Sequence, residues 1–233
     1  MKPDTASRRH FHDELDILQQ RIMEMAGLVE QAIAASTEAV LTRDVIGARL
    51  VRAADRRVDE LEIEVDERVI ALLALHQPMA SDLRRIVTCH KLSNDLERMG
   101  DHASNIAKAV VRLEQLAPVP HLREMEEMID ATRGMVSDAL VAFVSRDAQL
   151  ARHVCSTDDR VDDLKRSMFR ILVTHMMEDP KRISGALELL LVSQNLERIA
   201  DLATNLGEDV VFLVEGRAIK HGAELPSSRS REE

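Results

Sequence analysis

Apolar residues recur along most of the chain at alternating intervals of three and four positions. Between residues 81 and 116 they are Leu92, Leu96, Met99, Ala103, Ile106, Val110 and Leu113. Between residues 183 and 215 they are Leu189, Val192, Leu196, Ile199, Ala203, Leu206, Val210 and Leu213. This spacing places apolar side chains on one side of an α-helix and is typical of helices that pack in left-handed bundles. We therefore predict long helices that bury one side against each other.

The same pattern, with the residues that end helices, predicts six long helices. They cover approximately 11–42, 45–77, 81–116, 121–145, 148–179 and 183–215. Asp44 and Asp147 are suited to cap the second and fifth helices, because a carboxylate accepts hydrogen bonds from free N–H groups of the first turn. Pro78 and Pro180 follow the predicted ends of these helices, since proline disfavours helical geometry in the preceding residue. Ser81 is the predicted cap of the third helix.

The helices form two copies of a three-helix unit. Residues 92–106 read LSNDLERMGDHASNI and residues 192–206 read VSQNLERIADLATNL, with seven of the fifteen positions identical. Residues 55–61 and 158–164 repeat a second acidic motif 103 positions apart. This period is too long for a solenoid and indicates a duplicated domain. We predict an all-α fold of two elongated three-helix bundles in tandem, covering 1–117 and 118–218, with a disordered polar tail at 219–233.

Composition and charge narrow the function further. The chain has four Phe and neither Trp nor Tyr, so its core is aliphatic, which suits packed helices better than a β-sandwich. A net charge of −10 argues against nucleic acid as the main ligand. There is no apolar run of about 18 residues, so no membrane span is predicted. Two cysteines without a CxxC motif and the lack of an apolar leader predict a cytoplasmic protein with inert thiols.

Carboxylates recur at four-residue spacing beside the apolar stripes. The predicted metal-binding residues are Asp55, Asp59, Glu97 and Asp101 in the first half, and Asp158, Asp162, Glu197 and Asp201 in the second. Like charges at this spacing repel one another on a helix, and a bound cation relieves the repulsion. Oxygen ligands suit divalent ions such as Mg²⁺, Ca²⁺ or Mn²⁺, and carboxylate clusters also hold iron. The alternative is a solvated helix flank paired with Arg56, Arg57, Arg98, Arg160 and Arg198.

No catalytic motif accompanies these carboxylates, and no catalytic residue is predicted. His102 follows Asp101, but Leu202 stands at the equivalent position of the second copy, so we expect no metal-ligand role for it. The Glu-x-x-His motif of di-iron proteins is absent, as are phosphate-binding glycine loops and GxSxG. A carboxylate–metal hydrolase and a purely structural helical dimer remain as alternatives to a regulatory protein.

These motifs resemble the PhoU family, the phosphate-signalling accessory proteins of bacteria. The resemblance rests on the duplicated unit, on DLRRI at 82–86 leading into 95–106, and on 195–205, and it covers about residues 10–216. It implies two antiparallel three-helix bundles with acidic faces that can hold metal clusters. It also implies a non-enzymatic, homodimeric regulator. Such proteins are thought to link the ATPase subunit of the phosphate ABC transporter to a sensor histidine kinase and to silence the phosphate-starvation response.

The second copy departs from this pattern in two places. Arg182, Ile183 and Ser184 replace the Asp-Leu-Arg segment of the first copy. Lys165 stands where the first copy has Glu62. A lysine among carboxylates competes with a metal ion for them, so we expect the second acidic site to be weaker or empty.

Overall fold

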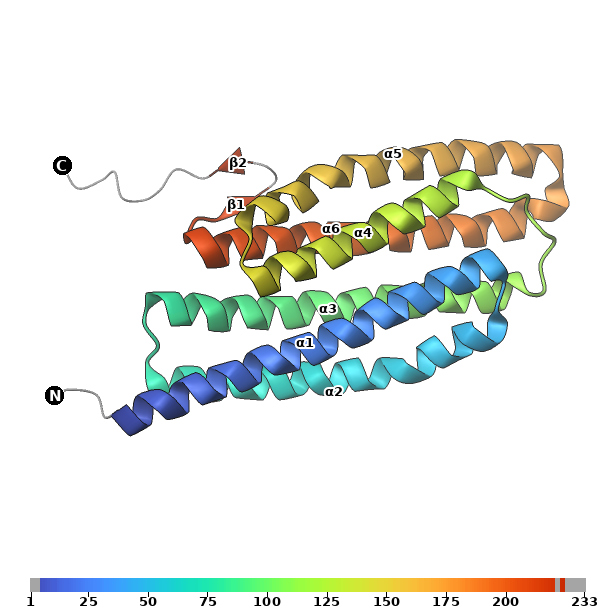
Figure 1. Cartoon of the computed structure of the whole chain (residues 1–233). Coiled ribbons are helices and arrows are strands. Elements are labelled where there is room, and N and C mark those ends of the chain that lie inside the picture. Colours follow the sequence, from blue (N-terminus) through green and yellow to red (C-terminus); the bar gives the residue numbers. More distant parts are fainter. Residues whose placement is uncertain (1–4, 221–222, 225–233) are drawn as a thin grey trace.

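Two three-helix bundles make up nearly all of the described part of the chain (Figure 1). The computed structural model describes residues 5–220 and 223–224. The first bundle contains α1 (Thr5–Thr42), α2 (Val45–His76) and α3 (Ala80–Leu113), and the second contains α4 (Arg123–Ser145), α5 (Ala148–Glu178) and α6 (Ile183–Glu215). Consecutive helices run in opposite directions within each bundle (Figure 1). The predicted all-α fold of six long helices is confirmed.

The helix ends agree closely with the local sequence signals. The Asp44 carboxylate accepts a hydrogen bond of 3.0 Å from the backbone N–H of Gly47, and Asp147 caps α5 in the same way. Gln77 ends α2 in a left-handed conformation, with a φ of 44°, directly before Pro78. The Ser81 prediction was wrong: the extended residue before α3 is Met79, so Ser81 already lies in the first helical turn. A cap residue needs an extended backbone, which Ser81 lacks.

Two short elements lie outside the six helices. A 3₁₀ turn, Pro180–Arg182, joins α5 to α6. After α6, the strands β1 (Ile219–Lys220) and β2 (Ala223–Glu224) pair antiparallel in a part of the predicted disordered tail. The remaining residues of that tail, 221–222 and 225–233, lie outside the described residues. No described helix is both long and apolar enough to cross a membrane.

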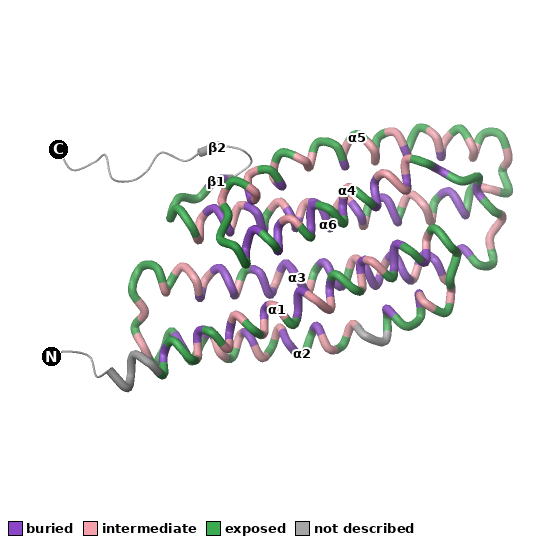
Figure 2. Tube along the Cα trace, in the orientation of Figure 1, coloured by how far each residue is buried: buried purple, intermediate pink, exposed green. Residues whose placement is uncertain are grey.

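The central helices α3 and α6 join the two bundles. They pack against each other as well as against the other helices of their own bundles, and buried residues recur along both of them (Figure 2). Their apolar stripes contribute fully buried side chains to one continuous core, including Leu92, Leu96, Met99, Ile106, Val192, Leu196, Ile199 and Leu206. The duplicated motifs therefore lie on the two helices at the centre of the fold.

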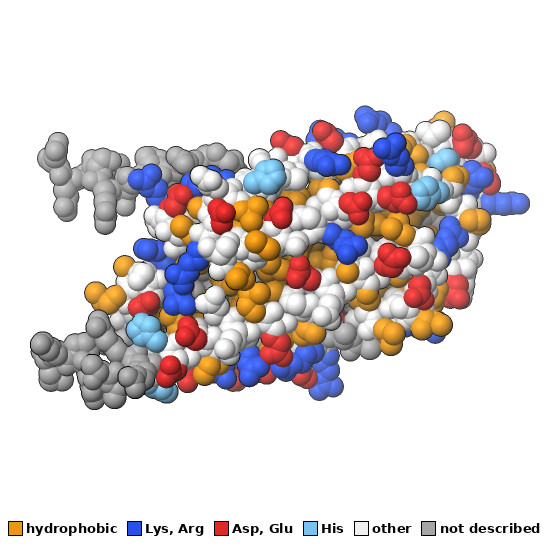
Figure 3. Space-filling model, in the orientation of Figure 1, with side chains coloured by type: hydrophobic (Ala, Val, Ile, Leu, Met, Phe, Trp, Pro, Cys, Tyr) orange, Lys and Arg blue, Asp and Glu red, His pale blue; other side chains and the backbone are white. Residues whose placement is uncertain are grey.

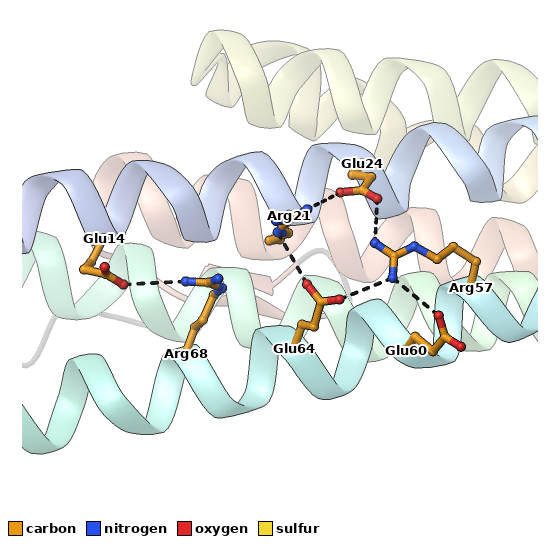
Figure 4. Close-up of polar contacts among 7 residues, drawn as sticks. All are labelled: Glu14, Arg21, Glu24, Arg57, Glu60, Glu64 and Arg68. Carbon is orange, nitrogen blue, oxygen red and sulfur yellow. Dashed lines mark hydrogen bonds and ion pairs between the residues drawn. The ribbon is translucent and has the colours of Figure 1, made fainter.

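Ion pairs join the outer helices α1 and α2 (Figure 4). Arg57 of α2 contacts Glu24 of α1 at 2.8 Å, and also Glu60 and Glu64 of its own helix at 3.4 and 3.2 Å. Arg21 of α1 contacts Glu64 at 3.4 Å. These side chains are more than a third exposed, so solvent screens the pairs and each contributes little to stability. Arg57 is therefore directed toward α1, where it contacts Glu24.

Candidate metal-binding faces

The structure brings the first-half carboxylates together where α2 runs beside α3. We define the first acidic face as Asp55, Asp59, Glu62, Glu97 and Asp101. A Cβ atom added to Gly100 would lie 3.6 Å from Oδ1 of Asp55, so this carboxylate lies close to the α3 backbone. The Ser104 hydroxyl also donates a hydrogen bond to Asp55. The Asp-x-x-x-Asp motif of α2 and the Glu-x-x-x-Asp motif of α3 thus share one surface.

Burial and mutual repulsion disfavour ionisation in the first acidic face. Burial is the main cause that raises the pKa of Glu97 to about 7, and repulsion from the other four carboxylates adds to it. Burial also raises the pKa of Asp55, although the Ser104 hydrogen bond and the charge of Lys108 oppose the shift. The pKa of Glu62 is raised, first by burial and then by neighbouring aspartates. A cation bound here would relieve this accumulated repulsion.

The first acidic face is not paired with the arginines that the salt-bridge alternative requires. Arg57 is engaged with the glutamates between α1 and α2. Arg56 contacts Glu60 at 3.3 Å, and Arg98 contacts Asp95 at 3.4 Å. Within the described part of the chain, no arginine forms an ion pair with a member of this face. The salt-bridge alternative therefore does not describe the first acidic face among the described residues.

The second half assembles its predicted carboxylates between α5 and α6. We define the second acidic face as Asp158, Asp162, Glu197 and Asp201. Burial is the main cause that raises the pKa of Asp158 to about 6, followed by repulsion from Asp201, Asp162, Asp159 and Glu197. The pKa of Asp201 is raised for the same leading reason, and the charges of Arg198 and Lys165 oppose the shift.

Unlike the first acidic face, the second contains its own cations. Nζ of Lys165 lies 2.8 Å from Oε1 of Glu197. The Arg198 guanidinium lies 3.8 Å from carboxylate oxygens of both Glu197 and Asp201. In this half, the salt-bridge alternative describes part of the surface.

A cavity of about 780 Å³ opens beside the second acidic face. Asp158 and Asp201 line it from the second bundle, and Arg98 and His102 reach it from α3. Nδ1 of His102 lies 2.9 Å from Oδ1 of Asn195, which joins the two bundles at its edge. His102 thus has a polar partner on the facing helix α6.

The donors fit a hard cation, although their present arrangement is open. Carboxylate oxygens are the ligands that Mg²⁺, Ca²⁺ and Mn²⁺ prefer. Among the residues that the structure describes, no three His, Cys, Asp or Glu side chains converge closely enough to hold one ion together. The carboxylate side chains would therefore have to change rotamer when an ion binds. Partly exposed Glu and Asp side chains at the flank of a helix are free to do so.

Three polar residues near the first acidic face were not predicted from the sequence to belong to the site. Ser104 bonds Asp55, and Lys108 places its Nζ 3.0 Å from Oδ1 of Asn105. Nδ1 of His90 lies 2.9 Å from Oδ1 of Asp66, at the end of α2's acidic stripe. Residues seven positions apart lie on the same side of a helix, so the position of His90, seven residues before Glu97, was an available signal.

The relation to known proteins follows from both bundles. The model of the PhoU domain matches residues 22–110 and again 125–210. The chain belongs to the PhoU family. The family resemblance of the acidic motifs is thus confirmed, and each three-helix bundle corresponds to one PhoU domain.

Relatives of similar length carry the same family name. The chain is 40% identical over 210 residues to the phosphate-specific transport system accessory protein PhoU homolog of Zymomonas mobilis, covering 89% of this chain and 87% of that protein. It is 38% identical over 214 residues to the homolog of Pseudomonas putida, covering 91% and 84%.

Solved PhoU structures have the same fold. The crystal structure of PhoU from Pseudomonas aeruginosa matches with a TM-score of 0.85 and 38% identity, covering 88% of this chain and 99% of that one. The phosphate transport system regulatory protein PhoU from Streptococcus pneumoniae matches with a TM-score of 0.81 and 30% identity, covering 90% and 99%. The tandem arrangement of the bundles is therefore shared with PhoU proteins.

Proposed function

We propose that this protein is a non-enzymatic regulator of phosphate uptake that acts in the cytoplasm. The observation that carries the proposal is the PhoU-domain match in both halves, which extends to relatives named as accessory proteins of phosphate-specific transport systems. In the finer form of the proposal, a homodimer contacts the ATPase subunit of the phosphate ABC transporter and a sensor histidine kinase. Through these contacts it silences the phosphate-starvation response when phosphate is abundant.

Deletion of the gene tests this proposal. In phosphate-rich medium, the deletion strain should take up more phosphate and express phosphate-starvation genes that the parent strain keeps silent. Re-expression of the wild-type protein should restore both readouts. Unchanged uptake and unchanged expression in the deletion strain would refute the regulatory role.

We further propose that the acidic faces bind divalent metal or iron ions through the carboxylates predicted from the sequence, and that the second face binds more weakly because Lys165 contacts Glu197. The raised pKa values of Glu97 and Asp158 support the proposal, since both faces gain from a counter-charge. Mn²⁺ at about 100 times its Kd should stabilise the native state by about 2.7 kcal/mol. A variant in which Asp55, Asp59, Glu97 and Asp101 are replaced by their amides should lose most of this stabilisation. If Mn²⁺ stabilises this variant as much as the wild type, the assignment of these carboxylates as metal ligands is refuted.

One observation favours a second candidate function, a carboxylate–metal hydrolase. A carboxyl group with a pKa of about 7, such as that of Glu97, has the affinity for protons that a general base needs near neutral pH. This candidate would replace the regulatory proposal if metal-loaded protein hydrolysed phosphate esters and if Glu97→Gln and Asp101→Asn each abolished the turnover. If these variants lose metal binding but the metal-loaded wild type hydrolyses no phosphate ester, the regulatory proposal is supported.

A further inference from the structure

We propose that Lys165 is an internal cation that takes the place of a metal ion at Glu197, so that the two acidic faces bind metal differently. The inference rests on the proposed metal binding by these faces. It specifies which of the two equivalent glutamates is available to bind a metal ion. Glu97 and Glu197 occupy equivalent positions in the two copies of the LER motif. On this account Glu97 is available to a metal, whereas Glu197 is already neutralised by the protein itself.

The contact between Lys165 and Glu197 bridges the helices α5 and α6. Nζ of Lys165 lies 2.8 Å from Oε1 of Glu197, and the glutamate side chain is only 16% exposed. The lysine side chain is 37% exposed, so solvent reaches the ammonium group although the glutamate that it contacts is mostly covered. The ammonium group thus occupies the position from which a cation would neutralise this carboxylate.

The other oxygen of Glu197 shows that the lysine satisfies the carboxylate only in part. Oε2 is buried and has no hydrogen-bond partner among the described residues. Nε of Arg198 lies 3.8 Å from this oxygen, beyond hydrogen-bond distance. A carboxylate with one paired and one unpaired oxygen retains the capacity to bind a metal ion once the ammonium group is removed.

The first acidic face has the opposite charge at the corresponding position. Glu62 stands there, and it adds to the repulsion around Glu97 instead of relieving it. No described residue forms an ion pair with Glu97. Lys108 acts on Asp55, whose pKa its charge lowers, and its Nζ bonds Oδ1 of Asn105 at 3.0 Å. Sequence-equivalent glutamates therefore have opposite electrostatic surroundings.

The test removes the internal cation and measures metal binding directly. Purified full-length protein is titrated with Mn²⁺ alone, and free Mn²⁺ is followed by electron paramagnetic resonance. Lys165→Glu, which restores the residue of the first half, should bind about one more equivalent of Mn²⁺ per chain than the wild type. Lys181→Glu is the matched control, because it makes the same change of charge at an exposed residue outside both faces. Lys165→Gln, which removes the cation without adding an acid, should give a smaller gain in the same direction.

The outcomes separate this inference from the proposal on which it rests. A gain in Lys165→Glu that is absent in Lys181→Glu and is removed by a further Glu197→Gln change supports the internal cation. Equal binding by the two lysine variants and the wild type overturns it, provided that circular dichroism shows both to be folded; if Lys165→Glu does not fold, Lys165→Gln decides in the same way. The metal role of the first acidic face is tested separately. It is refuted if the Glu97→Gln variant binds as much Mn²⁺ as the wild type.

Discussion

Neutralising Glu97 should stabilise the metal-free protein, although most substitutions in a packed protein destabilise it. Its pKa is raised from 4.5 to about 7, so the folded state disfavours the ionised carboxyl. This penalty is absent below about pH 4, where Glu97 is protonated in both states, and is complete above about pH 7. At 1.36 kcal/mol per pKa unit the shift amounts to about 3 kcal/mol. Because the side chain is partly exposed, solvent screening reduces this to about 1 kcal/mol.

Urea unfolding in the presence of a chelator measures this effect. At about pH 8, Glu97→Gln should raise the free energy of unfolding by about 1 kcal/mol and the Tm by about 2–4 °C. At about pH 4 the two proteins should be equally stable. Glu197→Gln is the matched control, and it should destabilise the protein by about 1 kcal/mol at pH 8 because it breaks the ion pair with Lys165. Destabilisation by Glu97→Gln of the same size as by Glu197→Gln would refute the electrostatic argument.

Three further predictions concern the packing and the thiols. Leu96→Ala should lower the free energy of unfolding by about 2–5 kcal/mol, since this side chain is fully buried, and a loss below about 1 kcal/mol would contradict the central role of α3. Gly207→Ala should destabilise the protein by about 1–3 kcal/mol, because the new Cβ would lie 2.8 Å from the carbonyl oxygen of Ala151. Gly27→Ala is the control and should not destabilise it, since no atom lies within 4 Å of that Cβ position. Equal effects of the two substitutions in urea unfolding would contradict the close approach of α5 and α6. Burial raises the pKa of Cys89 to about 12 and that of Cys155 to about 11, so both thiols should react with an aromatic disulfide reagent at least about tenfold more slowly in the native than in the unfolded protein; equal rates would contradict this.

The fold was predictable because its determinants are local. The caps at Asp44 and Asp147 and the helix end before Pro78 depend on residues within one turn of the chain. The apolar stripes of α3 and α6 also follow from helical periodicity alone. Ser81 shows where this logic fails, because the competing position, Met79, became extended directly after Pro78 and started the helix earlier.

The candidate site was only partly predictable, because it depends on contacts between helices. The sequence placed Asp55, Asp59, Glu97 and Asp101 in one half, and the structure brings them to one surface. It also marked Lys165 as a departure, but whether that lysine faces Glu197 or solvent depends on how α5 is rotated against α6. Identical motifs therefore acquired different electrostatic surroundings from residues outside the motif.

The charged surface illustrates the same distinction. Acidic and basic side chains are interspersed over the face shown in Figure 3, and hydrophobic side chains are visible between the two bundles. Against this mixed surface, the small group of carboxylates between α2 and α3 is distinctive because its members repel one another. Composition indicated an acidic protein, whereas helix packing determines which of its acids repel one another.

The most direct test of the acidic faces as metal-binding sites is elemental analysis of the protein as purified. The wild type should contain about one or more equivalents of a divalent metal or iron per chain, and a folded variant with Glu97, Asp101, Glu197 and Asp201 replaced by their amides should contain little. Equal metal contents in the two proteins, or no metal in the wild type even after dialysis against Mn²⁺, would contradict the account.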